Sequence, residues 1–123
     1  MLIVTNNPMV KENDSCGKEI LFIEGTYSDI LKECRDLIHK GYELLSHPLY
    51  SSVKPNETPY RTIILKDSAA ADNNSIILIE EAINTSTKFQ NDKMTPNWTK
   101  RVLEDFQVID YDIFNNTIQR IQY

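Results

Sequence analysis

Between residues 20 and 45 the chain reads as an apolar strand, a capped amphipathic helix and a second strand. Residues 20–23 are a continuous apolar run, and Thr26 with Asp29 three positions later resembles a capping box at the start of a helix. The apolar face of that helix holds Ile30, Leu31, Cys34, Leu37 and Ile38. Apolar residues at this spacing form one stripe of a helix, which packs against a sheet. A strand–helix–strand unit predicts an α/β protein, and it constrains the fold more than any other feature.

Two more apolar runs complete the predicted sheet. Residues 2–5 and 62–65 read as strands, and runs that are apolar on both sides are typical of sheets covered by helices on both faces. We therefore predict a single layered α/β domain over residues 1–123, with a mostly parallel sheet of about four strands flanked by helices. An α+β arrangement with an antiparallel edge strand is the main alternative, because the segment 46–61 is long enough for either direction.

Three further helices are expected in the second half of the chain. The first has an inward face from Ile76 to Thr87. The second should begin at Thr95 and Pro96, because threonine as N-cap followed by proline is common at helix starts. The last should begin at Asp110, read as its N-cap.

The charge and the apolar pattern exclude some classes of function. The chain has 13 Lys and Arg against 18 Asp and Glu, a net charge of −5, which argues against nucleic acid as a partner. Apolar residues make up 41% of it, as in a soluble globular protein, and no apolar run is long enough to cross a membrane. The N-terminus does not resemble a secretion signal, so we expect a cytoplasmic protein.

The cysteines and histidines give no sign of a metal or redox site. Cys34 lies on the apolar stripe and is interpreted as a core thiol, whereas Cys16 lies in a polar segment. A disulfide between them is left open, although a cytosolic setting argues against it. Together with His39 and His47 they do not have the spacing of a zinc site, and we expect neither metal nor cofactor.

Polar residues follow three of the predicted strands. Asn6 and Asn7 follow the first, Glu24 the second, and Ser46 and His47 the third. If these strands are parallel, the residues meet at one rim of the sheet, where ligands bind in open α/β folds. The alternative is ordinary turn chemistry, because Asn, Ser and Thr are common after strands for local reasons alone.

The segment 46–61 is the strongest candidate for a binding loop, since it is long, polar and contains three prolines. Lys54 and Arg61 have the charge to hold a carboxylate or phosphate. The predicted ligand-binding residues are Asn6, Asn7, Ser46, His47, Lys54, Asn56 and Arg61.

Two other hypotheses remain open for this segment. In a small enzyme, His47 would be the acid or base, with Glu57 or Glu24 as its partner. In a homodimer, Tyr50, Val53 and Tyr60 would lie at the centre of the contact. The sequence lacks a nucleophile elbow, a HExxH pattern and a glycine-rich phosphate loop, so recognition is the first hypothesis and the reaction itself is left open.

Four stretches of the chain resemble the GrdX family: IVTNNPMV, FIEG, DLIHKGYELLSHPLYSSVKPNETPYR and TPNWTKRVLEDFQVID. Members of this family are encoded beside the glycine, sarcosine or betaine reductase components of amino-acid-fermenting anaerobic bacteria. The resemblance implies a cytoplasmic accessory or regulatory protein of that system, and it carries no catalytic residue or cofactor to this chain. Combined with the loop, it leads us to expect a reductase component protein or a small anionic metabolite as the partner of residues 46–61.

Overall fold

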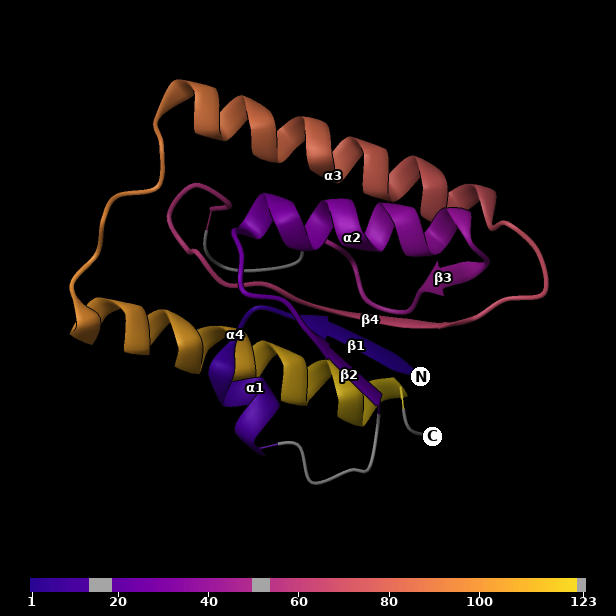
Figure 1. Ribbon diagram of the computed structural model, residues 1–123, viewed down its shortest axis with the longest axis horizontal. Coiled ribbons are helices and arrows are strands. Elements are labelled where there is room, and N and C mark those ends of the chain that lie inside the picture. Colours follow the sequence, from indigo (N-terminus) through magenta and orange to yellow (C-terminus); the bar gives the residue numbers. More distant parts are fainter. Residues whose placement is uncertain (14–18, 50–53, 122–123) are drawn as a thin grey trace.

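The computed structural model describes residues 1–13, 19–49 and 54–121, and in it helices cover both faces of a four-stranded sheet (Figure 1). The elements are β1 (Leu2–Thr5), α1 (Pro8–Asn13), β2 (Glu19–Phe22), α2 (Tyr27–His39), β3 (Tyr42–Leu44), β4 (Thr62–Asp67), α3 (Asn73–Asp92) and α4 (Lys100–Ile121). The predicted α/β class with a sheet of four strands is confirmed.

The sheet is mixed, so the expectation of a mostly parallel sheet was wrong. The strand order is β2-β1-β4-β3; β1 pairs parallel with β2, while β4 runs antiparallel to both β1 and β3. The long segment before β4 allows the chain to return in this direction. Because β1, β2 and β3 all run the same way, their carboxyl ends share one rim, and β4 begins at that rim.

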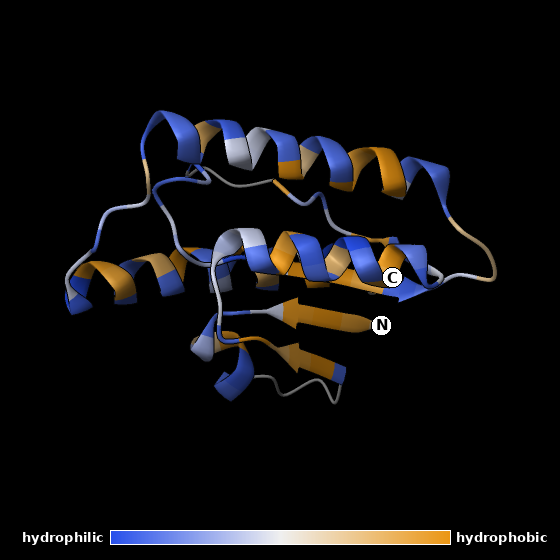
Figure 2. Cartoon of the chain, turned by 45° about the horizontal axis from the view of Figure 1, so that its top comes forward, coloured by the Kyte–Doolittle hydropathy of each residue, from blue (hydrophilic) through white to orange (hydrophobic). Residues whose placement is uncertain are grey.

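One face of the sheet packs against α2, and α3 lies outside α2 (Figure 1). Val4, Ile63 and Leu65 project from the strands toward the buried stripe of α2, and this places apolar strands at the centre of the molecule (Figure 2). The predicted stripe is confirmed: Ile30, Leu31, Cys34 and Ile38 are buried, and Leu37 is partly buried against them.

Cys34 is buried in this core as a free thiol, and burial raises its pKa above the ordinary value. The prediction of a core thiol is therefore confirmed. Cys16 lies outside the described residues.

The other face of the sheet packs against α1 and α4. Its buried residues are Ile3, Val10, Ile64, Phe114 and Ile118. The two helices predicted from Thr95 and Asp110 are in fact the single helix α4, which begins only at Lys100. Asp110 is not an N-cap, because it falls in register with Phe114 and Ile118 on the inward face and is itself buried.

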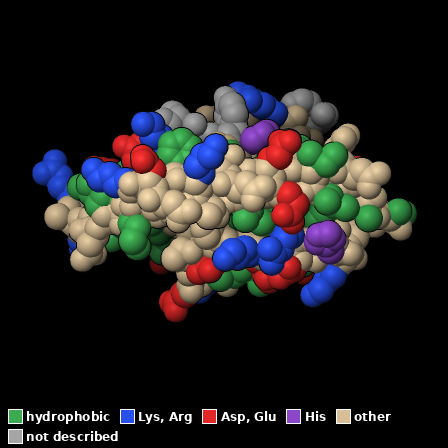
Figure 3. Space-filling view, turned by 90° about the horizontal axis from the view of Figure 1, so that it is seen from above, with side chains coloured by type: hydrophobic (Ala, Val, Ile, Leu, Met, Phe, Trp, Pro, Cys, Tyr) green, Lys and Arg blue, Asp and Glu red, His purple; other side chains and the backbone are tan. Residues whose placement is uncertain are grey.

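α3 and α4 are 20 and 22 residues long, but no helix in the described part of the chain is apolar enough along its length to cross a membrane. Ile79 and Ala82 of α3 are buried as predicted, whereas Thr87 is exposed and Ser86 is buried in its place. Acidic and basic side chains are intermixed on the face seen from above, over α3 (Figure 3).

The capping box at α2 is present as predicted. Thr26 Oγ1 accepts a hydrogen bond from Asp29 N at 3.2 Å, and the Asp29 carboxylate accepts one from Thr26 N at 2.8 Å. A Cβ atom on Gly25 would lie 2.6 Å from Asp29 Oδ2, so a residue without a side chain is required just before the cap. The cap fixes the point at which the chain leaves β2 and enters α2.

We predict that Gly41→Ala lowers the free energy of unfolding by about 1–2 kcal/mol, because Gly41 has φ of +114°, which side chains disfavour. Urea denaturation measures the change. The matched control is Lys40→Ala, at the exposed preceding residue with φ of −89°, which should change stability by less than about 0.5 kcal/mol. Equal effects of the two substitutions would contradict the conformational argument.

Candidate functional site

A buried carboxylate, Asp110, joins α4 to the start of β4. Asp110 Oδ1 accepts from Thr62 N at 3.1 Å, and Oδ2 accepts from Thr62 Oγ1 at 2.6 Å and from Asn7 Nδ2 at 3.0 Å. Thr5 Oγ1 lies 2.7 Å from Thr62 Oγ1, and since the Thr62 hydrogen goes to Asp110, Thr5 is the donor of that pair. Burial raises the pKa of Asp110, while the bonds from Thr62 and the Arg61 charge oppose the rise.

Asn6 connects three segments at the rim. Its Nδ2 donates to Gly25 O at 3.0 Å and to Pro59 O at 2.8 Å, and its Oδ1 accepts from Arg61 N at 2.9 Å. The amide therefore holds the ends of β1 and β2 and the start of β4 in place. That Asn6 also contacts a ligand stays a prediction.

Asn7 is fully buried and bonds to α4. Its Nδ2 donates to Gln107 O at 2.9 Å and to Asp110, and its Oδ1 accepts from Met9 N at 3.0 Å, at the start of α1. The side chain fixes both helices on this face of the sheet, and a ligand contact of Asn7 likewise stays a prediction.

The free edge of β4 is completed by side chains rather than by a strand. β3 pairs with β4 only at residues 65–67. Beyond that point Leu45 N donates to Ile64 O at 2.8 Å, Ser46 Oγ accepts from Ile64 N at 2.9 Å, and Asp110 accepts from Thr62 N. The chain then turns away from the sheet, and a hollow is left along the edge of β4.

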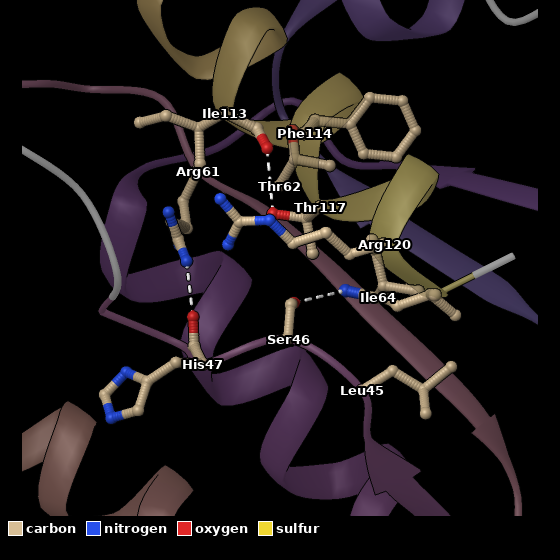
Figure 4. A pocket seen from close by; sticks show the side chains of 11 residues that line it. Leu45, Ser46, His47, Arg61, Thr62, Ile64, Ile113, Phe114, Thr117 and Arg120 are labelled. Atoms are coloured by element: carbon tan, nitrogen blue, oxygen red, sulfur yellow. Dashed lines mark hydrogen bonds between the residues drawn. The ribbon is translucent and has the colours of Figure 1, made fainter. Parts of the chain in front are cut away.

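This hollow, called the β4 cleft below, has a volume of about 270 Å³ and lies between the loop after β3, the first half of β4 and the last turns of α4 (Figure 4). Its polar side chains are Ser46, Arg61, Thr62, Thr117 and Arg120, together with His47 at the loop. It therefore contains three of the predicted ligand-binding residues: Ser46, His47 and Arg61.

Two arginines converge in the β4 cleft. Arg61 is only 3% exposed, and its Nη2 donates to His47 O. Arg120 extends from α4 across the cleft, so that its guanidinium points toward Arg61 (Figure 4). No acidic residue is found among the described residues that line the cleft. Two planar guanidinium groups facing a common space can bind a carboxylate or phosphate with charge-assisted hydrogen bonds.

His47 contributes its backbone rather than its ring. The ring is exposed and lies away from Arg120 in Figure 4, and its Nδ1 accepts from Leu49 N at 3.1 Å. The ring thus fixes the loop, while the carbonyl holds Arg61. In the described part of the chain no hydrogen bond or ion pair joins His47 to Glu57 or Glu24, the partners of the enzyme hypothesis.

The rest of the predicted loop site lies elsewhere. Asn56 Nδ2 donates to Lys93 O at 2.9 Å and to Phe89 O at 3.3 Å, and Trp98 Nε1 donates to Glu57 O at 2.7 Å. Lys54, Asn56 and Glu57 consequently line a separate hollow of about 290 Å³ at the end of α3. Neither Lys54 nor Asn56 lines the β4 cleft with Arg61.

The dimer hypothesis rests mainly on residues that the structure does not describe. Tyr50 and Val53 lie outside the described residues, and the hydroxyl of Tyr60 accepts from Gln107 Nε2 at 2.9 Å within the same chain. The contact between copies therefore stays a prediction.

Three residues of α4 were missed by the sequence reading: Asp110, Thr117 and Arg120. The available signal was their spacing, because Asp110, Ile113, Thr117 and Arg120 recur every three or four positions and so share one helix face. Polar residues on an otherwise inward face indicate partners on the sheet or a lined cavity.

A family model described as GrdX-like protein matches residues 2–119 of the chain. No curated protein and no solved structure gives a significant match. The matched region contains the network around Asp110 and most of the β4 cleft, and it ends one residue before Arg120.

We predict that Asp110→Asn lowers the free energy of unfolding by at least about 2 kcal/mol, because an amide nitrogen replaces an oxygen that accepts from buried donors of Thr62 and Asn7. Urea denaturation at neutral pH measures the change. The control is Asp112→Asn, an exposed position on the same helix, which should stay within about 0.5 kcal/mol of the unsubstituted protein. A loss no larger than that of the control would refute the role of Asp110.

The pH dependence of stability should carry the sign of the Asp110 shift. Because its pKa is raised in the folded state, its contribution is fully present below the unfolded value, near ~3.9, and is lost as pH rises through the folded pKa. The stability difference between the unsubstituted protein and Asp110→Asn should therefore narrow as pH rises from about 4 toward neutrality. A difference that widens with pH would mean that the hydrogen bonds outweigh burial.

Proposed function

The chain belongs to the GrdX-like family, and from this premise we propose that it is an accessory or regulatory protein that binds a small anion in the β4 cleft. The proposed setting is the glycine, sarcosine or betaine reductase system, which is what the resemblance of its motifs to the GrdX family implies. The anion-binding part of the proposal rests on the cleft itself.

The observation that carries the proposal is the convergence of Arg61 and Arg120. Like charges repel, and the repulsion is stronger where one of them is removed from water, as Arg61 is at 3% exposure. An anion between the two guanidinium groups reverses the sign of this interaction and accepts hydrogen bonds from both. In a protein with a net charge of −5, such a cleft is a local site for negative ligands.

The arrangement supports binding in preference to chemistry. Ser46 Oγ accepts from Ile64 N and the His47 ring accepts from Leu49 N, so these neighbours do not form a nucleophile–base pair. The side chains of the rim are engaged in holding segments together. Fixed donors around a cavity are what a recognition site requires.

We predict that Arg120→Gln weakens anion binding about tenfold or more, since a hydrogen bond to a charged group contributes roughly 1.5–3 kcal/mol. Calorimetric titration with phosphate and acetyl phosphate, supported by thermal shifts with these anions and with glycine and betaine, measures the effect. The control is Arg101→Gln, the same substitution at an exposed position near the start of α4.

Identical affinities for the Arg120→Gln and Arg101→Gln proteins would contradict the role of the cleft. The absence of binding by any of the four compounds to the unsubstituted protein would remove support for the anion as well. For the setting, size-exclusion chromatography with purified reductase components, with and without anion, should detect a complex; no complex under either condition would count against the reductase association.

A further inference from the structure

We propose that the ligand of the β4 cleft is a small aliphatic carboxylate, an organic anion with a short apolar tail, and not an inorganic anion. This inference rests on the proposed function, because it names the class of anion that the same cleft would bind. It follows from the apolar lining, from the separation of polar and apolar groups, and from the position of the cleft at the C-terminal end of a helix.

Much of the cleft is apolar. Its apolar residues are Leu45, Ile64, Ile113, Phe114 and Ile121. Ile64 and Phe114 belong to the buried core on this face of the sheet, so this part of the lining is fixed by packing. An inorganic anion would leave these side chains facing water, whereas an aliphatic tail would cover them and gain the free energy of removing apolar surface from water.

The polar and apolar groups lie on different sides of the cavity. Figure 4 shows Arg61 and His47 on one side, Leu45, Ile64 and Phe114 on the other, and the Arg120 guanidinium between them. A ligand with a charged head and an apolar tail matches this separation. Its carboxylate would meet the two guanidinium groups and its tail would lie toward Ile64 and Phe114.

Ser46 supplies a further donor at the head of such a ligand. Its oxygen accepts from Ile64 N, and in the described part of the chain its hydroxyl hydrogen has no acceptor. A carboxylate oxygen can accept this hydrogen while the arginines bind on its other sides. Donors from the two guanidinium groups and one hydroxyl suit the two oxygens of a carboxylate.

The location in the fold argues against a doubly charged phosphate. The cleft lies beside Thr117, Arg120 and Ile121, in the last turns of α4, and α4 ends at Ile121. The C-terminal end of a helix carries partial negative charge, and phosphate sites favour the opposite end, where backbone N–H groups point at the anion. A single negative charge is therefore accommodated with less repulsion than two.

The volume limits the length of the tail. At about 270 Å³ the cavity is smaller than the pockets of roughly 300–1,000 Å³ that hold drug-sized ligands. We expect chains of a few carbon atoms to fit and longer chains to extend into solvent.

The test is calorimetric titration of the full chain with acetate, butyrate and hexanoate, and with phosphate, sulfate and butylammonium as comparison ligands. Affinity should rise about fourfold for each methylene that the cleft buries, the factor expected for burial of one CH₂ group, and then level off with length. Phosphate and sulfate should bind more weakly than butyrate, and butylammonium should not compete with it.

A pair of substitutions on one helix separates the apolar lining from general effects. Ile113→Ser, in the cleft, should reduce the gain from acetate to butyrate by about threefold or more, whereas Ile109→Ser, one turn earlier and 37% exposed, should leave it unchanged. Arg120→Gln should weaken all the carboxylates together and keep their order. Circular dichroism confirms that each variant is folded.

The outcomes distinguish this inference from the proposed function. If phosphate and sulfate bind through Arg120 and affinity for carboxylates does not rise with length, the anion site stands and the organic class is wrong. If no anion binds and Arg120→Gln has no effect, both the class and the anion site are wrong. If butylammonium binds as well as butyrate, binding follows the apolar tail alone, and the assignment of a carboxylate is overturned.

Discussion

The rest of the structure depends on the hydrogen bonds that the buried carboxylate of Asp110 accepts from Thr62 and Asn7. They join the end of β1, the start of β4 and the middle of α4. They also satisfy a backbone N–H of β4 beyond the end of β3, where no strand is present to accept it. Because β4 and α4 form two walls of the β4 cleft, the position of its two arginines follows from this one polar contact.

Local signals predicted most of the fold. The stripe of α2, its capping box and the four apolar runs follow from the order of side chains along a few turns or strands, so the sequence alone contains them. The division of α4 was wrong because Asp110 and Thr95 are ordinary cap residues when only their neighbours are considered. What places Asp110 inside the helix is a bond to Thr62, 48 residues away. The direction of β4 likewise depends on long-range pairing with β1 and β3.

The candidate site divides along the same line. Ser46, His47 and Arg61 meet as expected because the ends of parallel strands share a rim. Lys54 and Asn56 are drawn to the end of α3, since Asn56 bonds to the carbonyls of Phe89 and Lys93. No property of the loop sequence specifies that contact. Arg120 was missed because a basic residue near a helix end is usually explained by the helix itself.

The central claim is that the β4 cleft binds an organic anion between Arg61 and Arg120. The most direct test is a crystal structure of the protein grown with butyrate. The account predicts a carboxylate within hydrogen-bond distance of both guanidinium groups, with the tail against Ile64 and Phe114. Butyrate bound elsewhere, or a cleft that holds only water at a saturating concentration, would contradict it.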